Sequence, residues 1–492
     1  MSAKALNMIW VLALLPGLAQ AFNSGSTGVD GDFNPTANIK LPLPADGVFN
    51  FKSVNIPANV TVTFARNAAN TPVTLLVQTD ATIAGTIDVS GQKSADTGSA
   101  GDQNLADDGI PALGGPGGFD GGAGGYPVNP SIGLSTRGGD GQGPGGGIGN
   151  IYCNYVYDPN GSSSYGLGGS GGGFGMDGPK GTAGNCHNAV VGGKSYGNYQ
   201  LQPLIGGSGG GGSGGARYYV RGIAGGGGGG ALLLAVTGTV NVTGKILANG
   251  GGSGNNGVIS GYGSNKDSVS ESAGGGSGGA IRIMASALKG NGQITANGGS
   301  SSASGNGGAG RIRFEVESNF LSTAPSPLSV NTSTPGLIFI PNHPSLAIAS
   351  VAGVALGSNS EISIPASTTN PVNVVINATG IPIGTLVALT AKPENDAGVS
   401  AAPSALVGTA ENSSATLQVD LPVGASILEA STTFVITASL GDQLAPYAGN
   451  ERVEKIKLVA STGGLSETHL ITVSGKTYPA PQGLWAAGGG FL

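Results

Sequence analysis

Residues 225–250 read GGGGGGALLLAVTGTVNVTGKILANG, a run of six glycines that leads directly into an apolar stretch. The alternation of apolar and polar residues after the glycines predicts one strand, then a second short strand and a turn. The glycines can be read in two ways, because a flexible linker and an ordered, closely packed backbone can have the same composition. Which of the two is present decides the fold.

The same pattern recurs elsewhere in the chain. Residues 73–91, VTLLVQTDATIAGTIDVSG, align with 232–250 without a gap, and 281–298, IRIMASALKGNGQITANG, align after a one-residue deletion. Residues 310–317, GRIRFEVE, form a partial further copy. A single unit cannot bury its apolar face alone, so stacking of like units predicts a glycine-rich parallel β-helix, or β-solenoid, over residues 48–317.

The glycine tracts keep a constant position relative to these repeats. Gly230, Gly279 and Gly310 each precede a repeat strand by one residue, and a linker has no reason to keep that register. Glycine has no Cβ, so extended glycine segments can approach one another and form hydrogen bonds side by side. We therefore predict polyglycine-II-like tracts at 114–149 and 166–230.

The composition changes after the repeats. Five prolines mark a linker at 318–345, and short alternating strands at about ten-residue spacing over 346–475 predict a β-sandwich of immunoglobulin or fibronectin type. Residues 22–47 form a polar lead-in segment and 476–492 a short apolar tail. The expected fold class is all-β, with the glycine-rich β-solenoid followed by the β-sandwich.

The N-terminus predicts export. Lys4 is followed by an apolar run over 5–18 and by the small-x-small sequence Ala19-Gln20-Ala21, so residues 1–21 are interpreted as a signal peptide and Phe22 as the first mature residue. An N-terminal membrane anchor is the alternative, although the run is short for a span. We expect a secreted or cell-surface protein with no transmembrane span in its mature form.

Composition and charge limit the classes of binding partner that can be expected. Glycine accounts for 95 of 492 residues, but 39% of the chain is apolar and only 10% is charged, which is not the composition of a disordered chain. The net charge is −6 and the 21 Lys and Arg residues are scattered, so no nucleic-acid partner is expected. Cys153 and Cys186 form a predicted disulfide in an oxidising compartment, with two free thiols as the alternative.

The sequence carries no motif that specifies a reaction or a cofactor. His187, His343 and His469 lie far apart along the chain, which argues against a histidine-based triad or zinc site. No metal is expected; the calcium candidates are aspartates in glycine-rich loops, and solvated surface carboxylates are the alternative. These aspartates are Asp107, Asp108, Asp120, Asp140 and Asp177.

Loop tyrosines are the candidate binding residues. They interrupt the predicted solenoid, and loops on a rigid scaffold commonly carry binding. Capping of the glycine tracts by the same rings is the alternative. The tyrosines are Tyr152, Tyr155, Tyr157, Tyr218 and Tyr219.

Three segments carry a family resemblance: IPANVTVTF (56–64), residues 73–91 and GGGSGGAIRI (274–283). They resemble uncharacterised glycine-rich exported bacterial surface proteins, which look like parallel β-helices with glycine inserts. The tracts are also similar in kind to the polyglycine-II sandwiches at the tips of phage tail-fibre adhesins. The resemblance implies an exported surface or adhesive protein and supplies no catalytic residue.

The expected function is therefore non-catalytic. We expect a structural or adhesive protein whose candidate partners are a cell-surface or matrix glycan, a protein, or a second copy of the chain. The alternative is a carbohydrate-active β-helix protein of the polysaccharide lyase or hydrolase kind, which would need clustered carboxylates or basic residues on one sheet face.

Overall fold

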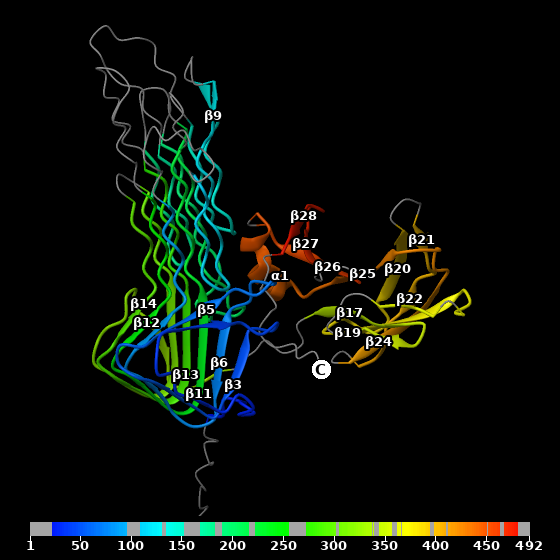
Figure 1. The fold of residues 1–492 in the computed structure, drawn as a ribbon, viewed down its shortest axis with the longest axis horizontal. Helices are drawn as coiled ribbons and strands as arrows, with labels where there is room; N and C mark the ends of the chain where they lie inside the picture. The colour runs from blue at the N-terminus through cyan, green and yellow to red at the C-terminus, as the bar shows by residue number, and fades with distance from the viewer. Residues whose placement is uncertain are drawn as a thin grey trace, which may run out of the picture.

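The structure, a computed structural model, describes most of the chain from Phe22 to Ala480 (Figure 1). The described residues are 22–95, 109–129, 134–151, 168–182, 189–215, 222–254, 272–301, 305–336, 338, 344–356, 362–365, 367–393, 398–409, 412–449, 451–462 and 467–480.

Two parallel sheets form the N-terminal part. Sheet A consists of β1 (Asp32–Phe33), β3 (Val48–Phe51), β4 (Ser53–Ile56), β6 (Val73–Val77), β7 (Ala81–Ile83), β11 (Ala231–Val242), β13 (Ala280–Gly290), β15 (Arg311–Leu321) and β16 (Val330–Thr332). Sheet B consists of β2 (Ile39–Pro42), β5 (Thr61–Ala65), β8 (Thr86–Asp88), β12 (Lys245–Leu247) and β14 (Gln293–Thr295). The chain alternates between the sheets, so each repeat places one longer strand in A and one short strand in B.

The repeat alignment made from the sequence is confirmed by the strand register. Leu234 of β11 lies beside both Leu75 and Ile283, and Ile246 of β12 lies beside both Ile87 and Ile294. All six side chains are buried in the apolar core between the sheets. Like residues therefore stack on like residues from one repeat to the next, which buries a continuous column of aliphatic side chains.

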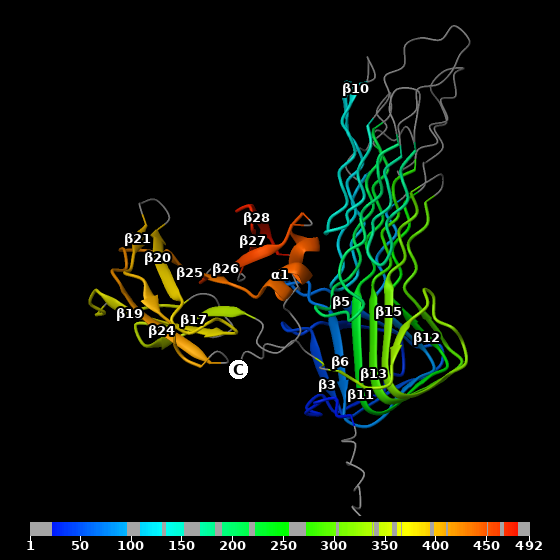
Figure 2. The same cartoon turned by 180° about the vertical axis from the view of Figure 1, so that it is seen from behind.

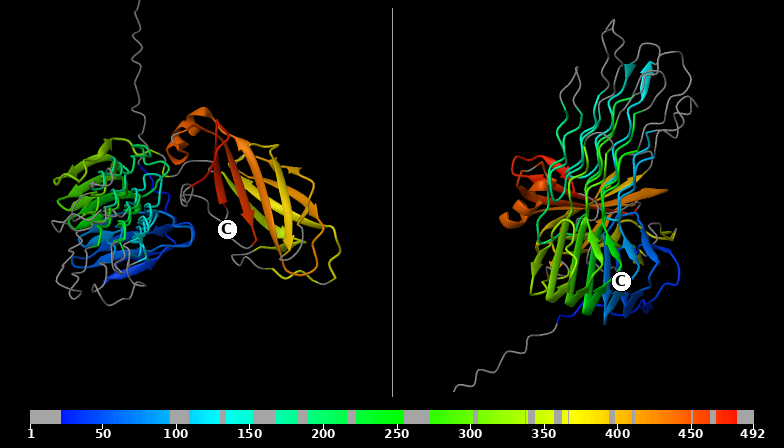
Figure 3. Two further views of the ribbon diagram at one scale, coloured as in Figure 1. Left: turned by 90° about the horizontal axis from the view of Figure 1, so that it is seen from above. Right: turned by 90° about the vertical axis from the view of Figure 1, so that its left-hand side faces the viewer.

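Glycine-rich segments continue from these sheets as an array of extended chains (Figures 1 and 3). We call them the glycine array. Residues 222–230, 272–279 and 305–310 run directly into β11, β13 and β15 of sheet A. The remaining segments of the array are 91–95, 109–125, 136–150, 168–181, 190–194, 206–215, 249–254 and 297–301.

Each interior segment of the array has hydrogen-bonded neighbours on several sides. Within 222–230, the N–H of Gly228 donates to Phe119 O and that of Gly229 to Ser277 O, both at 2.8 Å. The same segment accepts from Gly207 (2.8 Å) and Gly251 (2.7 Å). Gly227 also donates to Gln92 O at 3.1 Å. A strand in a flat sheet has two hydrogen-bonded neighbours, whereas this segment has five, so the array is packed in three dimensions.

Serine side chains link segments inside the array. Ser170, Ser208, Ser213 and Ser277 are fully buried, and their hydroxyl groups bond backbone or side-chain groups of other segments. Ser208 is an example: its Oγ accepts from the N–H of Gly145 at 3.0 Å and donates to the hydroxyl oxygen of Tyr196 at 3.0 Å. The serines that interrupt the glycine runs thus fix which segments lie side by side.

The C-terminal part consists of two antiparallel sheets around a common core. One sheet contains β17 (Ser345–Val351), β18 (Val354–Ala355), β19 (Val372–Thr379), β23 (Val407–Gly408) and β24 (Ser413–Val419). The other contains β20 (Leu386–Pro393), β21 (Val399–Ser400), β22 (Ser404–Ala405), β25 (Ser426–Val435), β26 (Val453–Ser461), β27 (Glu467–Thr472) and β28 (Thr477–Pro479). Between β25 and β26 lie α1 (Ala438–Leu444) and the 3₁₀ turn η1 (Ala445–Tyr447).

The fold class expected from the sequence is wrong. Sheets A and B are wholly parallel, an arrangement typical of α/β proteins, in which helices cover the sheets. Among the described residues, however, the helical segments are only α1 and η1, so the chain fits neither the all-β nor the α/β class. Helices are not needed here because sheets A and B bury their apolar faces against each other.

The immunoglobulin or fibronectin type expected for residues 346–475 was part of the same fold-class prediction and is also wrong. Such a sandwich has about seven strands, whereas the two C-terminal sheets contain five and seven strands, with a helix between β25 and β26. Sheet A also continues beyond the expected start of the linker at 318, because β15 extends to Leu321 and β16 pairs with it in parallel.

A substitution inside the array tests its close packing. A Cβ added to Gly228 would lie 2.0 Å from Gly207 O, so Gly228→Ala forces backbones apart. We expect it to lower the free energy of unfolding by about 1–3 kcal/mol, the usual cost of overpacking. Chemical denaturation of the full chain measures this loss.

Gly139→Ala is the matched control for this substitution. Its Cβ would meet its nearest neighbour, Ala123 N, at 3.0 Å, so a small shift accommodates it. We expect a change within about 1 kcal/mol. Equal stability of the two variants would contradict a close-packed array.

Candidate functional site

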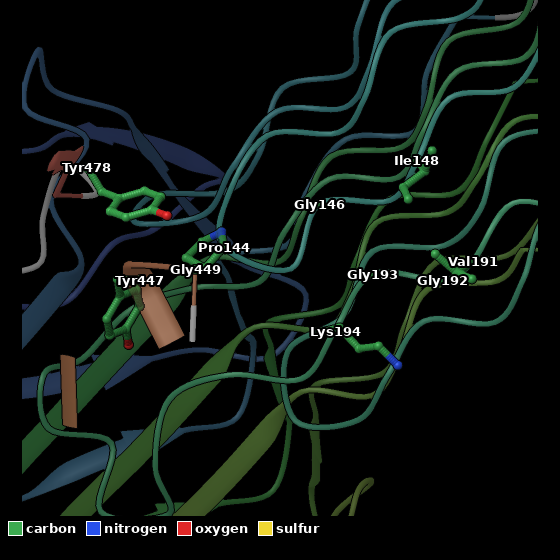
Figure 4. A pocket seen from close by; sticks show the side chains of 10 residues that line it. All are labelled: Pro144, Gly146, Ile148, Val191, Gly192, Gly193, Lys194, Tyr447, Gly449 and Tyr478. Atoms are coloured by element: carbon green, nitrogen blue, oxygen red, sulfur yellow. The ribbon is translucent and has the colours of Figure 1, made fainter. Parts of the chain in front are cut away.

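An open groove lies where the glycine array meets the C-terminal sheets (Figure 4). Its volume is about 380 Å³. One wall belongs to the array and the other to the segments after α1 and β27. The lining residues are Pro144, Gly146, Ile148, Val191, Gly192, Gly193, Lys194, Tyr447, Gly449 and Tyr478.

Two tyrosines form the C-terminal wall. Tyr447 ends η1, and Tyr478 lies in the edge strand β28 beside Leu470. Gly449 lies between the two rings and has a φ of +65°. A Cβ at this position would lie only 2.7 Å from the hydroxyl oxygen of Tyr478. Glycine is therefore required at 449, because it satisfies both the left-handed backbone and the space taken by Tyr478.

An aromatic cluster lies beneath the groove and joins the three parts of the molecule. The ring of Tyr196, in the array, packs edge-on against Tyr447, with ring centroids 5.9 Å apart, and lies tilted against Phe174, with centroids 4.9 Å apart. Arg311, the first residue of β15, places its guanidinium group over Phe174 at 5.6 Å and over Tyr199 at 4.6 Å. The cluster holds the wall of the groove against the array and the end of sheet A.

The two buried tyrosine hydroxyls of this cluster differ in their partners. That of Tyr196 donates to Gly206 O at 2.6 Å and accepts from Ser208. That of Tyr447 is buried and has no hydrogen-bond partner among the described residues. Burial raises the pKa of both phenols well above the usual range, so both are neutral donors at physiological pH.

An exposed ion pair borders the groove on the array side. The ammonium group of Lys194 lies 2.9 Å from Oδ2 of Asp177, and Oδ1 of Asp177 accepts from the N–H of Ser195 at 2.7 Å. The hydrogen bond from Lys194 lowers the pKa of Asp177, so this carboxylate stays charged and neutralises the lysine. The groove is therefore bordered by a balanced pair of charges, with apolar and aromatic groups along its walls.

A second group of charges is closed to solvent. Arg282 and Arg313 donate from Nε to Oε1 of Glu315 at 2.8 and 2.6 Å, and the N–H of Gly336 donates to Oε2 at 2.7 Å. Arg282 and Glu315 are only 2% and 1% exposed. Arg282 also donates to Ile338 O at 3.2 Å. These charges anchor the segment after β16 to sheet A.

Opposing effects set the pKa of Glu315. Burial raises this pKa. The hydrogen bond and charge of Arg282, together with hydrogen bonds from Arg313 and the N–H of Gly336, lower it by more than burial raises it, so the pKa lies below the usual value. The carboxylate therefore contributes stability at pH values above the unfolded pKa. That contribution is lost as the pH falls through the lower folded pKa.

The three predicted aspartates that the structure describes, Asp120, Asp140 and Asp177, do not form one site. Among those described, each pairs with a separate cation and accepts from a nearby backbone N–H, as does Asp120 from Gly114 and Asp140 from Gly149. The pairs are Arg66–Asp120, Arg137–Asp140 and Lys194–Asp177. Within the described part of the chain, no group of three or more His, Cys, Asp or Glu side chains is arranged to hold a metal ion.

The other predicted site residues lie outside the described residues. They are Tyr152, Tyr155, Tyr157, Tyr218, Tyr219, Cys153, Cys186, Asp107 and Asp108. The described residues that flank three of these segments are close together. Asn150 Nδ2 donates to Gly168 O at 3.1 Å and to Thr182 O at 3.2 Å, which brings together the flanks of 152–167 and the start of 183–188.

Further contacts bring the flanks of 216–221 to the same place. The N–H of Asn150 donates to Gly212 O at 3.0 Å, and the N–H of Gly215 donates to Thr136 O at 3.4 Å. Thr136 follows β10 (Leu134–Ser135), which pairs with β9 (Pro127–Asn129) at the end of the array away from sheet A (Figure 2). The segments that carry the predicted tyrosines therefore start from that one end.

The residues that line the groove carry no signal in the sequence that joins them. Ile148, Val191, Tyr447 and Tyr478 are separated by up to several hundred positions, and no motif joins them. The one available signal was Tyr478 in a short strand next to the apolar tail.

Comparison with known proteins adds no relative. No protein-family model, no curated protein and no solved structure matches this chain. Among the described residues, no helix has both the length and the apolar character needed to cross a membrane.

The two tyrosine hydroxyls provide a matched pair of tests. Tyr447→Phe removes a buried hydroxyl that has no partner, so we expect it to raise the free energy of unfolding by about 1 kcal/mol. Tyr196→Phe removes two hydrogen bonds and should lower it by about 1–2 kcal/mol. Denaturant titration of both variants measures the difference, and a loss for Tyr447→Phe would contradict the assignment.

Glu315→Gln tests the buried charges. Loss of the negative charge leaves two arginines without their counterion, which should cost about 3 kcal/mol at neutral pH. At pH values under about 4.3, the stability of the wild-type protein should decrease as the pH falls and Glu315 becomes protonated. The variant should lack this part of the pH dependence. Glu317→Gln, on an exposed position of the same strand, should leave stability and its pH profile nearly unchanged.

Proposed function

We propose that this chain is a secreted or cell-surface protein with a structural and adhesive role, without catalysis, and that surface glycans are its ligand. The observation that carries the proposal is the glycine array, which extends from sheet A and ends where the tyrosine-bearing segments begin. A protein that must hold binding loops away from its base needs a spacer of this kind.

The physics of the array supports a spacer role. An isolated glycine chain is the most flexible polypeptide, but the bonds that tie each interior segment to several neighbours suppress that freedom. Side chains are nearly absent from the interior, so the array offers little surface for chemistry along its length. Recognition is then left to the segments at its far end, where the tyrosines can stack against sugar rings.

The compartment is part of the same proposal. The signal-like residues 1–21 support export, and the resemblance of the repeats to glycine-rich exported bacterial surface proteins supports a place at the cell surface.

A glycan array probed with the purified full chain tests the proposal. We expect binding to a subset of glycans, and Tyr218→Ala combined with Tyr219→Ala should weaken it at least tenfold, since stacking area is lost. Tyr199→Ala is the control, because this exposed tyrosine lies at the base of the array beside Arg311.

The bound glycans also need to be followed over time. An unchanged chain length after prolonged incubation is the expected result. Depolymerisation of an acidic polysaccharide would contradict the proposal and favour a carbohydrate-active protein.

A further inference from the structure

Accessible polar side chains lie on both walls of the groove. On the C-terminal wall, the hydroxyl group of Tyr478 forms no hydrogen bond with another described residue and, unlike that of Tyr447, is not buried. On the array wall, the ammonium group of Lys194 donates to Asp177, and its side chain is 69% exposed. Both groups can therefore form hydrogen bonds with a molecule that occupies the groove.

The rest of the lining is apolar or lacks a side chain. Pro144, Ile148 and Val191 contribute aliphatic groups, and several glycines contribute only backbone (Figure 4). Val191 is 52% exposed, so this apolar surface is open to a ligand. The groove therefore combines apolar and aromatic surface with polar side chains on opposite walls.

This combination matches the chemistry of an uncharged sugar. A pyranose ring has C–H groups on its faces and hydroxyl groups around its edge, so the faces pack against apolar and aromatic groups while the hydroxyls bond polar ones. An anionic ligand fits less well, because Asp177 already neutralises Lys194. The volume of about 380 Å³ lies within the range of roughly 300–1,000 Å³ that small-molecule sites occupy.

The groove also lies beside the segments to which the proposed function assigns glycan binding. Its array wall includes residues 144–148, which lead into 152–167, the segment that carries three of the predicted tyrosines. A glycan bound by those tyrosines and a glycan bound in the groove would therefore contact the same stretch of the array.

We propose that this groove is a binding site for an uncharged glycan. The proposal rests on the proposed function, because it gives a place and a chemical class to the same kind of ligand. A sugar ring packs against Pro144 and Val191. The Tyr478 hydroxyl bonds one of its edge hydroxyls, and Lys194 bonds another while it keeps its contact with Asp177.

An array of neutral and acidic glycans, probed with variants of the full chain, tests this proposal. Val191→Arg places a long charged side chain in the lining and should weaken binding to neutral glycans at least tenfold. Val423→Arg, at a fully exposed position outside the lining of the groove, is the matched control and should bind as the wild type does.

A smaller change keeps the test decisive if Val191→Arg disturbs folding. Tyr478→Phe removes only the hydroxyl group and should weaken binding of the same neutral glycans about fivefold, the effect of one neutral hydrogen bond. Tyr199→Phe removes a hydroxyl from an exposed tyrosine outside the lining and should leave binding unchanged.

The results separate this proposal from the proposed function. If the wild-type chain binds no glycan, the proposed function fails and the groove assignment fails with it. If the wild type binds glycans and Tyr478→Phe and Val191→Arg bind them equally well, the groove assignment is overturned while the proposed function stands. A loss confined to acidic glycans would also overturn it, because that result assigns the groove to an anionic ligand.

Discussion

The hydrogen bond between one glycine backbone and another is the interaction on which the rest of the structure depends. It forms in several directions around a single segment, as around 222–230, only because no Cβ stands between the chains. Each bond contributes modestly, about 1 kcal/mol net. The number of bonds, rather than apolar burial, is what opposes the large conformational entropy of so many glycines.

This constraint explains why the array and sheet A form a continuous body. Backbone bonds between identical residues do not specify a register, since a glycine segment could slide past its neighbour. The register is imposed from outside by aliphatic columns such as Leu75, Leu234 and Ile283 in sheet A, and from inside by serines such as Ser208. The apolar repeats therefore align the glycine segments, and the serines keep them aligned farther from the sheets.

The sequence predicts this organisation better than it predicts the fold class. The repeat alignment could be made because equivalent residues stack, and Gly230, Gly279 and Gly310 precede their strands at one register. The class was wrong because wholly parallel sheets that no helices cover fit neither the all-β nor the α/β class, and alternating apolar residues show only that strands exist. The groove could not be predicted, since it depends on tertiary contacts such as that between Tyr196 and Tyr447.

Arg311 connects the glycine array to the C-terminal sheets through its hydrogen bonds to the aromatic cluster. It follows the glycine segment 305–310, begins β15, and donates to the carbonyl oxygens of Phe174 and Tyr196 at 3.3 and 2.9 Å. A force applied at the far end of the array would therefore reach sheet A through β15 and the C-terminal sheets through Tyr196 and Tyr447. The aromatic cluster is therefore a second connection between the array and the C-terminal sheets, beside the covalent chain.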